Sequence, residues 1–191
     1  MPNWCYTSYV VTGDEKEVCD LYEKMRSLEQ RKESLVENGF GKTWLGNLVT
    51  LLGGEWQNIY CRGWWDGLEK DDDCHIRFWT ESAWSDPDEV IEFLTTKYPD
   101  LSFYFSAEEG GMGYFVTNDA DCDYFHHYVL ESFDEEDYYT GLELDELLRD
   151  VEKIVGKEVK TLDEAILAIE DYNNDKEYEE DWYKIKVFKI V

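Results

Sequence analysis

The order of strand-like and helix-like segments limits the folds open to this chain. Residues 6–12 (YTSYVVT) are rich in β-branched and aromatic side chains and stop at Gly13, which indicates a strand. Apolar residues at helical spacing then predict an amphipathic helix from Asp14, the expected N-cap, to about Ser34. This opening favours a fold that mixes strands with helices.

A second block of the same kind follows further along the chain. Residues 75–81 alternate between apolar and polar side chains, as a half-buried strand does. Residues 86–98 begin with an acidic, proline-containing helix start and continue with an apolar stripe. Residues 101–106 and 112–117 predict two more strands, which a glycine pair joins into a hairpin. The sequence therefore predicts an α+β fold with a mainly antiparallel sheet and two packed helices.

Between these blocks the pattern is irregular. Residues 35–74 hold many glycines with tryptophans interleaved among them. We interpret this stretch as an insertion that its tryptophans pack against the sheet, with one short strand around Trp56–Arg62.

The C-terminal third is acidic and mostly helical. Residues 131–183 hold 20 of the 45 acids and only five bases. Apolar residues at helical spacing predict two helices, and Gly156 stands between them where a left-handed C-terminal residue belongs. Residues 183–189 alternate as a final strand, whose lysines protect it from edge-to-edge pairing.

Several short segments resemble a ferredoxin-like domain family of phage and plasmid accessory proteins, named after an aphid-phage Api protein. The resemblance covers roughly residues 1–130 and rests on Pro2-Asn3-Trp4-Cys5, Val11-Thr12-Gly13, Trp64-Trp65-Asp66, Phe78-Trp79-Thr80, Ala83-Trp84-Ser85-Asp86-Pro87, Tyr98-Pro99-Asp100-Leu101-Ser102-Phe103 and Glu108-Glu109-Gly110-Gly111-Met112-Gly113. It implies a ferredoxin-like chain topology and no iron–sulfur cluster, and it assigns no biochemical function.

Together these observations divide the chain into two parts. We predict a ferredoxin-like domain over residues 1–131, interrupted by the insertion at 35–74. An acidic helical extension with a terminal strand, residues 132–191, is expected to pack on the same core.

The net charge of −27 excludes several classes of partner. A phosphate-backbone binder needs lysines and arginines that displace counterions, and an anionic membrane surface attracts the same residues. We therefore expect no direct nucleic acid and no membrane partner. The sequence shows no signal segment, and its five cysteines form no CxxC pair, so we expect reduced thiols and a cytoplasmic protein.

Two groups of residues could ligate a metal ion. Asp119, Asp121 and Asp123 begin like a calcium loop, but Tyr124 stands where the loop needs glycine and Leu130 where it needs a bidentate acid. The alternatives are opportunistic cation binding and a solvated charged turn. Zinc ligands could come from the cysteines and histidines at two places, although no spacing is diagnostic: Cys74, His75, Cys122, His126 and His127.

No catalytic motif is recognisable, and no cofactor is expected. Glu108 and Glu109 beside a glycine turn are the candidates for a carboxylate-based enzyme, with or without a divalent cation; the alternative is a charged β-turn.

The acidic surplus instead favours a protein-binding module that masks a basic, nucleic-acid-binding surface of a partner protein. The candidate partner-binding residues are Asp134, Glu135, Glu136, Asp137, Asp145, Glu146, Asp150, Glu177, Glu179, Glu180 and Asp181.

Overall fold

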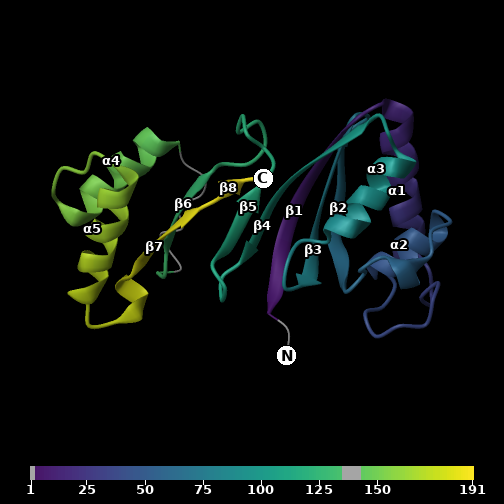
Figure 1. Cartoon of the computed structure of the whole chain (residues 1–191), viewed down its shortest axis with the longest axis horizontal. Coiled ribbons are helices and arrows are strands. Elements are labelled where there is room, and N and C mark those ends of the chain that lie inside the picture. The colour runs from purple at the N-terminus through teal and green to yellow at the C-terminus, as the bar shows by residue number, and fades with distance from the viewer. Residues whose placement is uncertain (1–2, 135–142) are drawn as a thin grey trace. The chain divides into compact units, whose positions relative to one another are not determined.

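The computed structural model describes residues 3–134 and 143–191, except for the side chain of Glu180 (Figure 1). Contacts divide the chain into two compact units, Met1–Asn118 and Asp119–Val191. The division falls earlier than the boundary predicted after residue 131, because the strand at 128–132 pairs with a strand of the second unit.

The first unit is built from an antiparallel sheet and three helices. Its elements are β1 (Trp4–Gly13), α1 (Glu15–Glu29), α2 (Leu45–Leu51), a 3₁₀ turn η1 (Trp56–Asn58), β2 (Gly63–Asp72), β3 (His75–Ala83), α3 (Asp88–Lys97), β4 (Leu101–Glu109) and β5 (Tyr114–Thr117). Its strands lie in the order β2-β3-β1-β4-β5. This order of strands, with α1 and α3 as the connecting helices, is that of a ferredoxin-like domain and confirms the α+β fold.

Helix α1 begins where the sequence predicts and ends early. The Asp14 carboxylate accepts the N–H groups of Lys16 and Glu17 at 3.0 and 3.2 Å, as an N-cap does. The helix ends at Glu29 rather than near Ser34. Residues 29–34 contain no apolar side chain, so extending the helix to Ser34 would bury nothing further.

The insertion is shorter and more regular than predicted. Residues 45–51 form α2, and the strand predicted at Trp56–Arg62 is wrong: the 3₁₀ turn lies there, and β2 begins at Gly63. A Cβ on Gly63 would lie 2.4 Å from the Glu81 carbonyl oxygen, so only glycine lets β2 approach β3 this closely. Gly63, one of the glycines that suggested irregular structure, thus serves strand pairing.

One face of the sheet carries the core of the first unit. Figure 1 shows α1, α2 and α3 on that face. Tyr9 and Val11 of β1 pack in one cluster with Leu21 of α1, Leu94 of α3 and Trp65 of β2, all almost fully buried. Burial of each such side chain contributes about 1.5–3 kcal/mol, which is why the helices hold this face.

The second unit has two helices and a strand pair. Its elements are β6 (Tyr128–Ser132), α4 (Leu144–Val155), α5 (Leu162–Asn174), a 3₁₀ turn η2 (Glu179–Asp181), β7 (Tyr183–Val187) and β8 (Lys189–Ile190). Strand β6 pairs antiparallel with β7. Gly156 ends α4 at φ 69°, the left-handed conformation that the sequence predicts.

The second unit also has a hydrophobic cluster of its own. Leu147 and Val151 of α4, Ala165 and Ile169 of α5 and Leu130 of β6 are buried together. Each helix packs one apolar face against this cluster, and its opposite face is exposed to solvent.

Across the described residues, no helix has both the length and the apolar character needed to cross a membrane.

Candidate protein-binding surface

Helix α4 carries three of the predicted partner-binding acids, and the structure gives two of them internal partners. The Asp150 carboxylate lies 2.7 Å from the Lys153 ammonium. The Glu146 carboxylate accepts the N–H of Glu143 at 3.2 Å and so helps to cap the helix. Asp145 is exposed.

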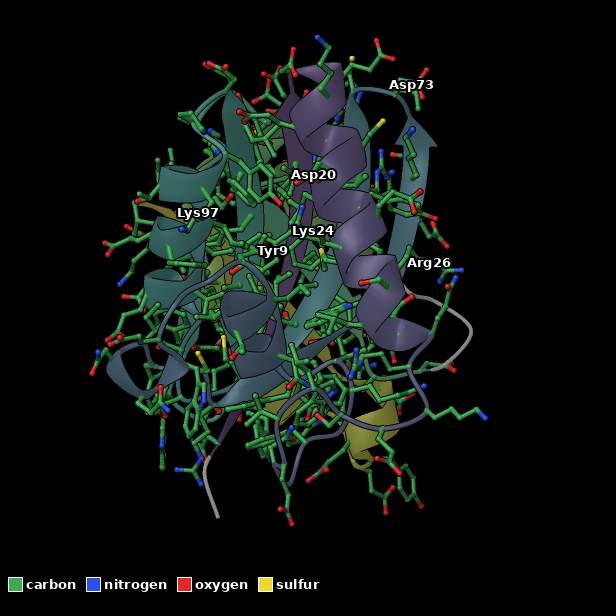
Figure 2. The ribbon with its side chains drawn as sticks, turned by 90° about the vertical axis from the view of Figure 1, so that its right-hand side faces the viewer. Tyr9, Asp20, Lys24, Arg26, Asp73 and Lys97 are labelled. Carbon is green, nitrogen blue, oxygen red and sulfur yellow. The ribbon has the colours of Figure 1, made fainter. Side chains whose placement is uncertain are left out.

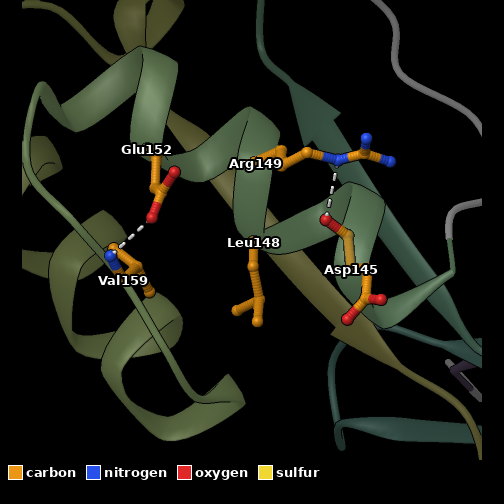
Figure 3. A pocket seen from close by; sticks show the side chains of 5 residues that line it. All are labelled: Asp145, Leu148, Arg149, Glu152 and Val159. Atoms are coloured by element: carbon orange, nitrogen blue, oxygen red, sulfur yellow. Dashed lines mark hydrogen bonds between the residues drawn. The ribbon is translucent and has the colours of Figure 1, made fainter.

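A surface hollow beside α4 is lined by Asp145, Leu148, Arg149, Glu152 and Val159 (Figure 3). The Arg149 Nε donates to the Asp145 carbonyl oxygen at 3.1 Å, and the Glu152 carboxylate accepts the Val159 N–H at 2.9 Å. Two of the polar side chains that line the hollow thus already form hydrogen bonds within α4 and with the loop that follows it. Both a cation and a carboxylate lie here, so the hollow favours neither sign of ligand.

Helix α5 presents a different outer face. Its acids are Asp163, Glu164, Glu170 and Asp171, all exposed, and the helix contains no lysine or arginine. Of these, Glu164 accepts the Lys160 N–H at 2.8 Å. The carboxylates of the other three form no hydrogen bond or ion pair with any described residue. Leu167, 60% exposed, lies on this face among them.

The acidic turn (residues 175–181) follows α5 and holds four further predicted residues, one of which is Glu180. Glu177, Glu179 and Asp181 are exposed, and Tyr178 between them is 60% exposed. The turn has one base, Lys176, whose ammonium lies 4.2 Å from the centre of the Tyr172 ring. Within the described chain, no hydrogen bond or ion pair engages the carboxylates of those three acids.

The remaining predicted partner-binding residues lie elsewhere. Asp134 is exposed, and its N–H donates to the Ser132 hydroxyl at 3.1 Å. Glu135, Glu136, Asp137 and the side chain of Glu180 lie outside the described residues.

In the first unit, the carboxylate of Asp20 is neutralised by a lysine of the same helix. Asp20 and Lys24, labelled in Figure 2, lie one turn apart on α1 with Nζ 2.6 Å from the carboxylate. The Tyr98 hydroxyl donates to the same carboxylate at 2.8 Å. The hydrogen bond from Lys24, more than that from Tyr98, lowers the pKa of Asp20.

The structure gives the first member of the predicted calcium loop a structural role. Asp119 is buried, and its carboxylate accepts the N–H groups of Asp123, Tyr124 and Phe125 at 2.6–3.1 Å. Asp121 and Asp123 are exposed. Within residues 3–134 and 143–191, no three or more His, Cys, Asp and Glu side chains, including the predicted zinc candidates, are grouped to hold a metal ion.

The catalytic candidates lie at the hairpin between β4 and β5. Glu109 is buried, and its carboxylate accepts the N–H groups of Gly111 and Met112 at 2.9 and 2.7 Å. Those bonds build the turn, as a charged β-turn would. Glu108 is half-buried beside it on β4.

Four of the five thiols have a pKa above the ordinary value. Burial raises the pKa of Cys5 to about 11 and that of Cys61 to about 12. Desolvation and nearby carboxylates also raise the pKa of Cys74 and Cys122. A raised pKa keeps a thiol protonated at neutral pH, and the thiolate is the nucleophile.

Sequence reasoning missed the outer face of α5. The predicted partner-binding residues include none of its four acids, because these acids stand as two pairs with five apolar residues between them and do not form a run. The signal lay in helical spacing: Asp163, Glu164, Glu170 and Asp171 stand three or four residues from Leu167.

Comparison with known proteins agrees with this fold. Residues 55–146 match the model of a family described as the ferredoxin-like domain in Api92-like protein. The match runs from the residue before η1 into the first turn of α4 and supports the ferredoxin-like α+β fold. Comparison with curated proteins and with solved structures gave no match.

Proposed function

We propose that this protein is an acidic protein-binding module that covers a basic, nucleic-acid-binding surface of a partner protein. The observation that carries the proposal is the set of exposed carboxylates on α5 and the acidic turn, most of which no cation of the described residues neutralises. With a net charge of −27, the chain attracts basic surfaces over a distance.

The physical basis is competition for the same cations. A basic surface binds nucleic acid because its lysines and arginines neutralise phosphates. Carboxylates held on a helix and a turn offer those cations an alternative partner at fixed positions, which favours complementary surfaces and fast association.

The proposal extends to the setting in which the protein acts. The resemblance to phage and plasmid accessory proteins suggests an accessory protein of a mobile element, acting in the cytoplasm. The five cysteines are free thiols, as expected of a reducing compartment. Direct binding of DNA or RNA is not expected from such a surface, and a band shift with either would contradict the proposal.

Salt-dependent capture tests the proposal. Basic proteins eluted from immobilised DNA are passed over the immobilised full chain at about 0.1 M and about 1 M salt, where the Debye length falls from ~10 to ~3 Å. We expect retention only at the lower salt concentration, and we expect the added chain to suppress the band shift of a retained protein with duplex DNA.

The matched control replaces the exposed acids of α5 and the acidic turn by Asn and Gln. This variant should lose retention and suppression together. Failure to retain any basic protein in a salt-sensitive way, or retention that leaves DNA binding unchanged, would refute the proposal.

A further inference from the structure

Leu167 has an unusual setting on the outer face of α5. The nearest surface neighbours of a helical residue are those three and four positions away in each direction. For Leu167 these are Asp163, Glu164, Glu170 and Asp171, so all four positions hold acids. A 60% exposed leucine thus forms the centre of a ring of carboxylates.

Helix stability does not explain this ring. Asp163 and Glu164 lie in the first turn, where negative charge is favourable. Glu170 and Asp171 lie near the C-terminal end, where the helix dipole disfavours acids, and the last turn contains no base. Leu167 is 60% exposed and does not belong to the hydrophobic cluster that contains Ala165, Ala168 and Ile169, so it contributes little to the core.

We infer that this face is the docking surface for a basic amphipathic helix of the partner protein; the inference rests on the proposed function and specifies the partner's contact element. An apolar side chain of that helix would cover Leu167. Lysines or arginines three and four residues from it would meet the four acids. Two helices that pack ridge into groove bring such positions together at 8–10 Å between their axes.

Charge and apolar content together select this occupant. Phosphates of a nucleic acid would be repelled by the ring, and a cationic tail without apolar residues would leave Leu167 exposed to water. Helix α5 has 13 residues, a length of about 20 Å, which accommodates three turns of a partner helix. Recognition of an amphipathic helix through anchors at such spacing is an established mode of peptide binding.

The test uses three synthetic peptides of about 18 residues, long enough to form a helix. The first places leucines in one helical stripe flanked by lysines. The second has the same composition in scrambled order, and the third replaces the leucines by serine. Binding to the full chain is measured by calorimetry at about 0.1 M salt. We expect the first peptide to bind about tenfold more tightly than the other two.

Variants locate the contact. Leu167→Ser should weaken binding of the first peptide about tenfold and leave the serine peptide unaffected. The pair Asp163→Asn and Asp171→Asn should weaken binding of the first peptide more than Asp145→Asn with Asp150→Asn on α4, which removes the same charge. Circular dichroism confirms that each variant keeps its helices.

The outcomes separate this inference from the proposed function. Salt-sensitive peptide binding that is equal for both charge pairs and indifferent to Leu167→Ser would overturn the inference and leave the proposed function standing. Tighter binding of duplex DNA than of any peptide would overturn both.

Discussion

Helices α4 and α5 begin with the same residues but differ in the charge of their exposed faces. Each begins Leu-Asp-Glu and each contains four acids. Counted from their first residues, the positions of Arg149 and Lys153 in α4 correspond to those of Leu167 and Asp171 in α5. Two residues therefore turn a mixed surface into a uniformly acidic one with an apolar centre.

The contacts widen this difference. In α4, Glu146, Asp150 and Glu152 each engage a group of the second unit itself. In α5 only Glu164 does so. The number of acids in a helix therefore does not define a binding surface; what matters is whether the fold already uses their carboxylates.

The largest expected effect is the difference in stability between a variant of a buried leucine and a variant of the exposed Leu167 in the second unit. Leu147→Ala on α4 should lower the free energy of unfolding by about 2–5 kcal/mol, because Leu147 is fully buried. Leu167→Ala should change it by less than about 0.5 kcal/mol. Hydrogen exchange of the amides of α4 and α5 measures both, and a loss above about 2 kcal/mol for Leu167→Ala would place that residue in the core.

Exchanging the two differing positions should move the binding surface. Leu167→Arg with Asp171→Lys gives α5 the pattern of α4, and we expect it to weaken binding of the amphipathic peptide by at least about tenfold, roughly 1.4 kcal/mol. Arg149→Leu with Lys153→Asp gives α4 the pattern of α5. If that variant binds the peptide at a second site, the pattern is sufficient. If the α5 exchange leaves binding intact, the difference between the two helices plays no part in binding.

A smaller effect should have opposite signs in the two helices. Asp171→Asn removes a charge that the C-terminal end of α5 disfavours, so it should stabilise the second unit by about 0.3–1 kcal/mol. Asp150→Asn removes the ion pair with Lys153 and should destabilise it by up to about 1 kcal/mol. Hydrogen exchange again provides the readout. Effects of the same sign would show that the local charge environment is the same in both helices.

Much of the fold could be predicted from sequence, while the surface could not. The strands and helices of the first unit follow from periodicity and from signals such as the Asp14 cap. The sequence did not predict the start of strand β2, because glycine is typical of loops. In the structure, Gly63 is needed there because the backbone of β3 lies too close for a side chain. Which carboxylates have partners depends on contacts that local sequence does not determine: Asp119 accepts amides up to six residues along the chain, and Tyr98 reaches Asp20 across 78 positions. Helical spacing predicts the ring of acids around Leu167, but a search for runs of consecutive acids does not find it.

The smallest expected effect uses a paired acid of the first unit as a reference for α5. Because the pKa of Asp20 is lowered on folding, its stabilising contribution is complete at pH values above about 3.9, the ordinary value, and is lost as the pH falls through the folded-state pKa. Asp20→Asn should therefore cost about 0.3–0.5 kcal/mol at neutral pH, as for an exposed pair one turn apart, and progressively less in acid. Urea unfolding followed by tryptophan fluorescence at several pH values measures the gap between the two proteins. Glu170→Gln, which removes an exposed acid of α5 that has no ion pair and lies towards the C-terminal end of the helix, should show no such loss at neutral pH. If the difference in the free energy of unfolding between the wild-type protein and Asp20→Asn stays constant from neutral to acid pH, the charge of Asp20 does not contribute to stability. The contrast between neutralised and exposed carboxylates would then be wrong.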